Sequence, residues 1–315
     1  MTFREFWQSL TEVYPEQEAR WIGRFVFEVR YGLSQADLLM GRETDIAEEE
    51  LRELQRRLLT GEPVQYVISQ APFGDHLFSV TPAVLIPRPE TLWLCRAVSN
   101  HLQTHGGNIL DIGTGSGCIA ITIALATAEH GMTPSFIATD EHGMTRNNYI
   151  RESPCSSDAK AEDRESPCSS VAKISAWDIS AEALAVARAN AERLQADVTF
   201  EQHDILTPPD DTARWDTIVS NPPYICEQEK TTMERNVLNY EPLLALFVPD
   251  DDPLLFYRAI ARYAIKALRP GGHLFLEINP LYARPLCNML LAQGFAEAHI
   301  CQDDYGKDRY IVASV

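Results

Sequence analysis

Basic residues are scarce in this sequence. The 315 residues include 27 Lys and Arg against 45 Asp and Glu, so the formal net charge at pH 7 is −18. Proteins that grip nucleic acid do so largely by neutralising phosphates with Lys and Arg. The deficit argues against a large DNA or RNA interface, and we expect no stable binding of nucleic acid. It leaves room only for a local basic patch.

Paired cysteines and long apolar runs are also missing. The seven cysteines are scattered and never form a Cys-x-x-Cys pair. This odd, dispersed set argues against a disulfide framework and a zinc site, and it fits a reducing compartment. No run approaches membrane-spanning length, and the first ten residues lack the apolar core of a signal peptide. We expect a soluble, cytoplasmic and monomeric protein without a bound metal.

Residues 1 to about 60 are predicted to form a helical bundle. Apolar residues recur at helical spacing from Phe3 to Leu10 and again from Ala19 to Val29. Glu48–Leu59 adds a strongly charged segment with a stripe of leucines. This bundle is small for an independent core, so we expect it to lean on the chain that follows.

Two segments connect the bundle to the rest of the chain. Val67–Val84 carries short β-like runs broken by Pro and Gly, which predicts a connecting β-hairpin. We place the domain boundary after residue 72, so that 1–72 is the helical domain and 73–315 the second domain. In Leu85–Thr91, two prolines flank Arg88 and stiffen the backbone. This segment is either a rigid linker or a lid over a pocket.

A glycine-rich turn follows the first strand expected in the second domain. Asn108–Ile112 is a short apolar strand, and Cys118–Ala128 is the helix after the turn. Alternate glycines let a ligand approach the backbone at a positively polarised helix N-terminus. Several nucleotide-like ligands would suit such a loop, which differs from the dinucleotide fingerprint in the place of its third glycine. The candidate ligand-binding residues are Asp111, Gly113, Thr114, Gly115 and Gly117.

The segment 129–173 is polar and contains a direct repeat. Arg151–Ser157 recurs as Arg164–Ser170 in a charged, Ser-rich context. Such a composition predicts a flexible surface insertion. A regulatory or partner-binding segment is the alternative.

Two strands that end in Asp compete for the place beside the glycine loop. One is Phe136–Asp140, and the other is Ile174–Asp178, which alone leads directly into a well-formed helix. An acid at this position can accept hydrogen bonds from two ribose hydroxyls. We prefer Asp178 for that role and keep Asp140 as the second choice, while a helix N-cap is the structural alternative for either. Asp204, after the next strand, could accept from an adenine amino group, while an ordinary Asp in a polar strand-end loop is the alternative.

The sequence Asn221-Pro222-Pro223-Tyr224 ends another apolar strand, Trp215–Ser220. Neither proline can donate a ladder hydrogen bond, so the strand stops there. The Asn221 amide oxygen and the Pro222 carbonyl are then two fixed acceptors beside an aromatic ring. They could hold a planar –NH2 group and present its nitrogen to an electrophile. A simple Pro-rich turn is the alternative.

The remaining elements complete a sheet. Leu254–Leu268 is an amphipathic helix, Pro270–Gly272 a turn and His273–Ile278 a fifth strand. Phe295–Cys301 and Arg309–Val312 are predicted to close the sheet as a hairpin. The fold class is therefore α/β, with a seven-stranded, mostly parallel, doubly wound sheet of Rossmann-like type. Functional residues follow several of its strands at their carboxyl ends, where such sheets bind ligands.

This arrangement resembles a class I S-adenosylmethionine-dependent methyltransferase, and more closely the HemK family. The motifs that carry the resemblance are Pro63–Tyr66, Leu85–Thr91, Asp111–Gly117 and Ser220–Ile225. HemK proteins are protein-(glutamine-N5) methyltransferases that modify peptide chain release factors, and their N-terminal bundle helps to dock that substrate. This chain departs from the family at Leu92-Trp93, where a second acid usually stands, and in the insertion.

The resemblance implies methyl transfer from S-adenosylmethionine to the glutamine of a Gly-Gly-Gln motif. It assigns catalysis to Asn221, Pro222 and Tyr224, and substrate binding to these residues together with Pro223 and Arg88. The cofactor would contact the glycine loop residues, Asp178, Asp204 and Asn221. A ribosomal-protein glutamine methyltransferase and an adenine-N6 methyltransferase of DNA or RNA are the enzymatic alternatives, because Asn-Pro-Pro-Tyr also serves the adenine amino group. A catalytically silent, ligand-binding scaffold is the alternative from another class.

Overall fold

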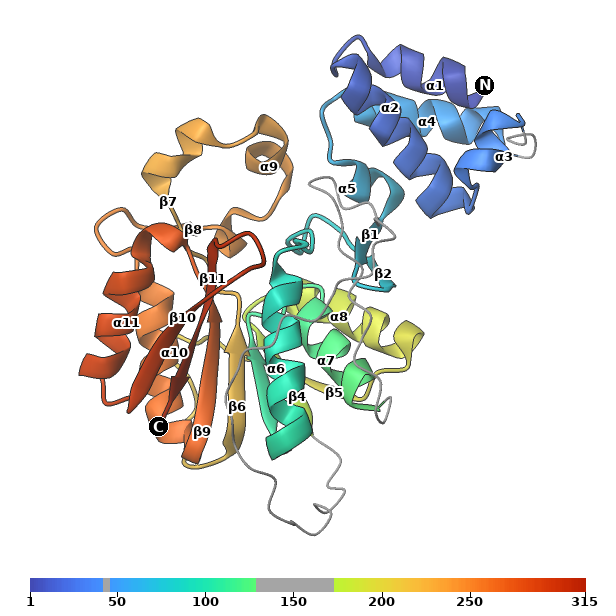
Figure 1. Cartoon of the computed structure of the whole chain (residues 1–315). Helices are drawn as coiled ribbons and strands as arrows, with labels where there is room; N and C mark the ends of the chain where they lie inside the picture. Colours follow the sequence, from blue (N-terminus) through green and yellow to red (C-terminus); the bar gives the residue numbers. More distant parts are fainter. Residues whose placement is uncertain (42–45, 129–172) are drawn as a thin grey trace.

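The computed structural model describes residues 1–41, 46–128 and 173–315 (Figure 1). The predicted insertion, apart from Lys173, and Asp140 lie outside these ranges. A helical N-terminal part and a larger α/β part follow one another along the chain. None of the helices in the described ranges combines the length and apolar character needed to cross a bilayer.

The N-terminal bundle forms as its apolar stripes predict. Thr2 and Glu5 begin the first helix with a reciprocal capping box. The first two helices approach closely at Gly23, where an added Cβ would lie 2.8 Å from the Trp7 Cβ. The buried core includes Phe6, Leu10, Ile22, Phe25, Leu51 and Leu58. The elements are α1 (Phe3–Leu10), α2 (Glu16–Phe25), the π-helix η1 (Val26–Arg30), α3 (Gln35–Leu39) and α4 (Glu48–Leu58).

The predicted hairpin is present, but it begins after a short helix that the sequence pattern did not predict. α5 (Val64–Ile68) precedes β1 (Gln70–Phe73) and β2 (His76–Ser79), which pair in antiparallel fashion. The boundary proposed after residue 72 falls inside β1. That boundary would divide a paired hairpin, which connects the helical part of the chain to the α/β part.

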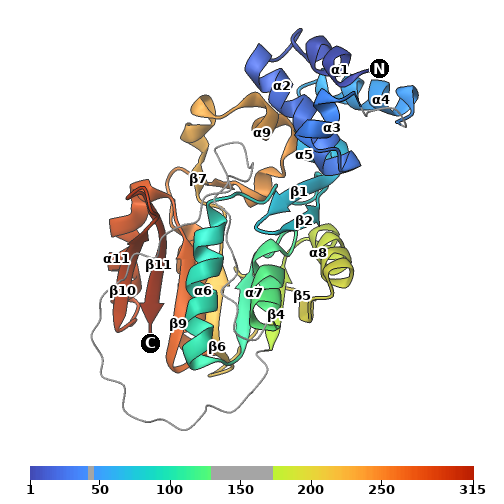
Figure 2. The same cartoon turned by 45° about the vertical axis from the view of Figure 1, so that its right-hand side comes forward.

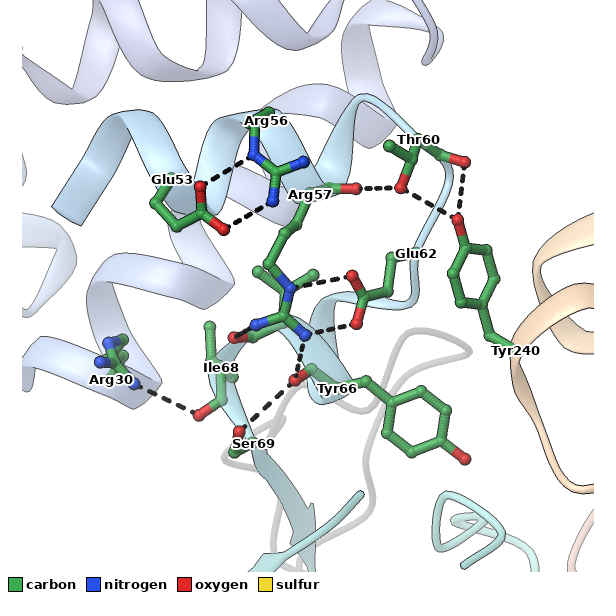
Figure 3. A network of polar contacts seen from close by, with 11 residues as sticks. Arg30, Glu53, Arg56, Arg57, Thr60, Glu62, Tyr66, Ile68, Ser69 and Tyr240 are labelled. Carbon is green, nitrogen blue, oxygen red and sulfur yellow. Dashed lines mark hydrogen bonds and ion pairs between the residues drawn. The ribbon is translucent and has the colours of Figure 1, made fainter. Parts of the chain in front are cut away.

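Arg57, in the last turn of α4, holds α5 in place. Its guanidinium donates to the carbonyl oxygens of Tyr66 at 3.1 Å and Val67 at 3.0 Å, and it pairs with Glu62 (Figure 3). Carbonyls at the end of a helix lack partners within the helix, and Arg is well suited to satisfy them. The Tyr66 hydroxyl in turn donates to the Val84 carbonyl at 2.6 Å.

The α/β part is built on a seven-stranded sheet in the order β10-β11-β9-β6-β3-β4-β5. β11 runs antiparallel to β9 and β10, and the other neighbours are parallel. This confirms the predicted α/β class and the mostly parallel seven-stranded sheet. The strands are β3 (Ile109–Ile112), β4 (Ile174–Asp178), β5 (Val198–Gln202), β6 (Trp215–Ser220), β9 (Leu268–Glu277), β10 (Glu297–Gln302) and β11 (Asp308–Ser314).

Helices cover both faces of the sheet, as a doubly wound fold requires. One apolar cluster joins residues of α6, α7 and α8 to one sheet face, and a second joins α10 and α11 to the other. Figure 1 shows the two helical layers on either side of the strands. Their bounds are α6 (Thr91–His105), α7 (Cys118–Ala128), α8 (Ala181–Leu194), α10 (Leu255–Ala267) and α11 (Ala283–Ala292).

The turn predicted at Pro270–Gly272 is instead an irregularity inside β9. The ladder with β6 pairs Trp215 with Leu268 and resumes with Thr217 opposite His273. The glycines permit this bulge, since Gly271 has φ +79° and a Cβ on Gly272 would lie 2.8 Å from the Arg269 carbonyl oxygen.

A long excursion separates β6 from α10 at the carboxyl edge of the sheet (Figures 1 and 2). This excursion contacts the helical part of the chain through Tyr240. The Tyr240 hydroxyl lies 3.0 Å from the Thr60 carbonyl oxygen and 2.9 Å from the Thr60 hydroxyl (Figure 3). The excursion contains β7 (Ile225–Cys226), η2 (Glu227–Thr232), α9 (Arg235–Tyr240), η3 (Leu243–Ala245) and β8 (Phe247–Val248).

Three histidine rings cluster at the opposite edge of the sheet. The rings of His101 and His105 lie 4.2 Å apart at 13°, and His273 lies 4.3 Å from His101. Burial, followed by the neighbouring His273 and His105, lowers the pKa of His101 to about 4, and burial also lowers the pKa of His273. The fold therefore favours the neutral forms of His101 and His273.

This cluster makes stability depend on pH. Histidines of the unfolded chain take up protons near pH 6.5, whereas His101 in the fold resists protonation until about pH 4. Its contribution is thus complete above the unfolded pKa and is lost as the pH falls towards the folded pKa. We expect a His101→Asn variant to lose less unfolding free energy than the parent between about pH 7.5 and pH 5.

Urea unfolding at the two pH values measures this difference. Buried carboxyls also titrate in this range, but they contribute equally to both proteins and cancel. His299→Asn, at a side chain that is 69% exposed, is the matched control and should follow the parent. An unchanged pH dependence in His101→Asn would refute the assignment.

Candidate active site

The glycine loop after β3 is hydrogen-bonded to the end of β4. The amides of Gly113 and Thr114 donate to the Trp177 carbonyl at 2.8 and 2.9 Å. All three glycines of the loop have positive φ, at +75°, +56° and +82° in chain order. This conformation explains why glycine is needed at each position.

The three glycines differ in what they face. A Cβ added at Gly113 or Gly115 would meet no atom within 4 Å, so these two border open space. A Cβ at Gly117 would lie 2.8 Å from Ile121 Cδ1 and 3.2 Å from Ala187 Cβ. Two glycines therefore leave room for a ligand, and the third lets α7 pack against α8.

Asp111 and Thr114 support this loop from beneath. Both residues are buried, and the Thr114 hydroxyl donates to Asp111 Oδ2 at 2.7 Å. Burial raises the pKa of Asp111 to about 7, although the Thr114 hydrogen bond works in the other direction. Because both side chains are buried, Asp111 and Thr114 would support a bound cofactor by fixing the shape of the glycine loop rather than by contacting the cofactor through an exposed surface.

Asp178 ends β4 beside the loop, as predicted from the sequence. Ile112 pairs with Trp177, so Gly113, the first residue after β3, lies beside Asp178, the last residue of β4. The Asp178 carboxylate accepts from the amides of Gly115 and Ser180, each at 2.9 Å. The Ser180 hydroxyl caps α8 by accepting from the Ala183 amide. The helix therefore has its own side-chain cap.

Two apolar residues near Asp178 and Asp204 escaped the sequence analysis. Ile179 and Leu206 are large aliphatic side chains that are each 47% exposed. Ile179 is tied to the neighbouring strand by a hydrogen bond from Gln202 to its carbonyl at 2.8 Å. Such side chains could form apolar walls for a flat ring. In the sequence, the signal for them was an apolar residue one or two positions after each of the two acids.

The Asn-Pro-Pro-Tyr segment begins directly after β6, next to the glycine loop. Ser220 pairs with Ile112, and its hydroxyl donates to the Ile112 carbonyl at 2.6 Å. Gly113 and Asn221 are thus the first residues beyond the ends of neighbouring strands. Asn221 is half-buried, and its Nδ2 donates to Thr91 Oγ1 at 3.3 Å.

Glu277 is a buried acid at this site that the sequence analysis missed. It ends β9 and is 4% exposed, and it accepts a hydrogen bond from the Tyr224 hydroxyl at 3.1 Å. Burial raises the pKa of Glu277 to about 7, while the hydroxyls of Thr91 and Tyr224 lower it. An acid at the end of the apolar run Leu274–Leu276 was the signal for it in the sequence.

Arg88 is positioned by an ion pair rather than left free. Its guanidinium lies 2.7 Å from Glu241 Oε1, and Glu241 Oε2 accepts from the Ile86 amide at 3.3 Å. The Glu241 side chain is only 1% exposed. Both residues line a cavity of about 1410 Å³ between α1–α2, the Pro-rich segment and residues 234–241.

Comparisons with known proteins extend over both parts of the chain. Residues 3–68 match the family model of the PrmC N-terminal domain, and residues 98–239 match the RMKL-like methyltransferase domain. The release factor glutamine methyltransferase of Bacteroides thetaiotaomicron is 38% identical over 98% of this chain and 96% of its own length. The protein of the same name from Flavobacterium psychrophilum is 32% identical over 98% and 95%.

The chain belongs to the release factor glutamine methyltransferase family. This confirms the resemblance inferred from the four motifs. Leu92, where the chain departs from the usual family pattern, packs with Phe73 and Phe78 in the core below the hairpin. In the described ranges, no group of three or more His, Cys, Asp or Glu residues is arranged to hold a metal.

In this family member, Asn190 ties the connecting hairpin to the glycine loop. This fully buried residue of α8 accepts from the Ser79 amide at 2.7 Å and donates to the Ser79 and Ser116 carbonyls, both at 2.9 Å. Sequence reasoning missed it, because only the fold brings β2 and the loop to the same helix.

Asn190→Leu should lower the free energy of unfolding by about 2–4 kcal/mol, because each buried polar group left without a partner costs about 1–3 kcal/mol. Equilibrium unfolding in urea measures the change. Glu192→Ala, at an exposed position of the same helix, should stay close to the parent. A loss in Asn190→Leu no larger than that of the control would contradict the bridging role.

Proposed function

We propose that this chain transfers a methyl group from S-adenosylmethionine to the side-chain amide nitrogen of the glutamine in the Gly-Gly-Gln motif of a peptide chain release factor. The observation that carries the proposal is the orientation of Asn221. Its Nδ2 is engaged by Thr91, which leaves its Oδ1 to accept from an incoming –NH2 group at the strand end next to the glycine loop.

The residues around the glycine loop fit the proposed cofactor. Gly113 and Gly115 border open space at the strand ends, and Asp178 beside them retains acceptor capacity for ribose hydroxyls. Asp204 would accept from the adenine amino group, with Ile179 and Leu206 flanking the ring. Bound S-adenosylmethionine would supply an electrophilic methyl group on its sulfonium.

The protein would contribute chiefly by placing the substrate amide. An amide nitrogen is a poor nucleophile, because its lone pair is delocalised. Asn221 Oδ1 and the Pro222 carbonyl would accept its two hydrogens, hold its face towards the methyl and stabilise the positive charge that develops on it. Positioning of this kind can supply up to about 7–11 kcal/mol. Tyr224 and Pro223 would pack against the glutamine, and the proton would leave to water.

The cavity lined by the bundle and Arg88 is our candidate for docking the release factor. It joins residues of α1 and α2 to residues 86–90 and 234–241, so one substrate could touch the bundle and reach the active-site edge. We also propose a cytoplasmic monomer without stable nucleic-acid binding. Among the described residues, Cys95, Cys118, Cys226 and Cys287 form no disulfide, which supports a reducing compartment, and the net charge of −18 argues against nucleic-acid binding.

A transfer assay with labelled S-adenosylmethionine tests the proposed function. The substrates are a purified release factor, its Gly-Gly-Gln→Gly-Gly-Ala version, ribosomal proteins, DNA and rRNA in separate reactions. We expect label only on the intact release factor. Label on nucleic acid alone would favour the adenine-N6 reaction, label on a ribosomal protein the related glutamine reaction, and cofactor binding without any transfer the silent scaffold.

A further inference from the structure

An asparagine side chain can present either its oxygen or its NH2 group to a ligand. Only the outward oxygen of Asn221 can accept from a substrate –NH2 group, so a flipped amide would oppose its own substrate. The contact with Thr91 Oγ1 does not choose by itself, because a hydroxyl can both donate and accept. Something beyond Thr91 must set the direction of this hydrogen bond.

Glu277 lies where it can set that direction. An ionised carboxylate only accepts hydrogen bonds. Ser220 pairs with Leu276, so Glu277 lies at the strand end beside Asn221. The Asn221 amide contacts Thr91, and the Thr91 hydroxyl favours the ionised form of Glu277 by lowering its pKa. Glu277 Oε1 receives the Tyr224 hydroxyl, whereas Oε2 is buried without a partner of ordinary hydrogen-bond geometry among the described residues. A buried oxygen that lacks a donor attracts the Thr91 hydroxyl hydrogen, since leaving it unsatisfied is costly.

We propose that Glu277 and Thr91 are positioning residues that hold the Asn221 amide with its oxygen towards the substrate. The Thr91 hydroxyl donates to Glu277, so its oxygen is left to accept from Asn221 Nδ2, and Asn221 Oδ1 remains free for the glutamine amide. The same carboxylate fixes Tyr224 through its other oxygen. One buried acid thereby orients two members of the Asn-Pro-Pro-Tyr segment.

The burial of the three groups favours this reading over a chance contact. Thr91 is 2% exposed and Glu277 4% exposed, so water does not compete freely for their hydrogen bonds. Thr91 lies in the first turn of α6, Asn221 follows β6 and Glu277 ends β9. The three elements meet at the active-site edge, and the β9 backbone is held there by the Tyr257 hydroxyl, which donates to the Glu277 carbonyl at 3.0 Å.

The inference rests on the proposed function and is tested with a pair of variants at one position. Thr91→Val keeps the shape of the side chain but removes the hydroxyl, and Thr91→Ser keeps the hydroxyl. We expect Thr91→Val to lower kcat by about tenfold to a hundredfold, with little change in the Kd of S-adenosylmethionine or in the KM of the release factor. Thr91→Ser should restore most of kcat.

Glu277→Gln provides a second, independent measurement. Its amide can donate as well as accept, so the direction of the Thr91 hydrogen bond is no longer imposed. We expect kcat to fall while cofactor binding persists. Equal kcat in the Val and Ser variants, or parent-like kcat in Thr91→Val and Glu277→Gln, would overturn the inference while leaving the proposed function intact. Failure of the parent protein on a release factor would instead overturn the proposed function.

Discussion

Replacing Asn221 by alanine should lower turnover by about a hundredfold to a thousandfold, the range seen when one preorganised hydrogen-bonding group is removed from the reacting centre. The variant loses the acceptor that holds the substrate amide, while the glycine loop and Asp178 are untouched. The Kd of S-adenosylmethionine should therefore stay nearly unchanged. Single-turnover transfer and calorimetric titration of the cofactor measure the two quantities separately.

Two further variants sharpen this test. Asn221→Asp keeps an acceptor oxygen but adds a charge, and we expect it to retain more activity than the alanine variant. Asn100→Ala changes an exposed asparagine of α6 and should behave as the parent. A loss of cofactor affinity in parallel with turnover would contradict the role assigned to Asn221.

The second large effect is expected at Asp178. Hydrogen bonds to a charged group contribute about 1.5–3 kcal/mol each, and each 1.4 kcal/mol is about tenfold in affinity. Loss of two such bonds to the ribose should raise the Kd of S-adenosylmethionine by tenfold or more in Asp178→Ala. Turnover at saturating cofactor should fall much less than in Asn221→Ala.

Calorimetric titration of the cofactor also decides between the two candidate acids. Asp197→Ala, an exposed position just after α8, is the control and should bind the cofactor normally. If Asp178→Ala binds normally and Asp140→Ala does not, the acid that holds the ribose lies in the segment before Lys173. Our placement of the ribose at the end of β4 would then be wrong.

Local sequence patterns were enough to predict the parallel sheet. β3, β4 and β6 are short apolar runs that end at a glycine loop, an acid and two prolines, and each signal lies within a few residues of the strand it ends. The choice of Ile174–Asp178 as the strand beside β3 agrees with the observed register. Asp140, the competing candidate acid, lies outside the described residues.

The features that were missed depend on contacts between distant segments. α5 contains β-branched Val64, Val67 and Ile68, which favour a strand, yet the guanidinium of Arg57 stabilises its helical end. The Pro-Gly-Gly sequence of β9 normally ends a strand, but pairing with β6 on both sides turns it into a bulge.

The supporting residues of the site were hidden for the same reason. Thr91 and Glu277 look like an ordinary helix start and an ordinary strand end, and Asn190 looks like a polar residue of an amphipathic helix. Only the closed fold places Thr91 against Asn221, and Asn190 against Ser79 and Ser116. No local periodicity carries that information.

The most direct measurement is the mass of the Gly-Gly-Gln peptide of the release factor, isolated from cells that lack this gene and from cells in which it is restored. We predict that one methyl group appears only after restoration, and that fragmentation places it on the side-chain nitrogen of the glutamine. Restoration with Asn221→Ala should leave the peptide largely unmodified. An unmodified glutamine in cells with the intact gene, or a methyl group on another residue, would contradict the account.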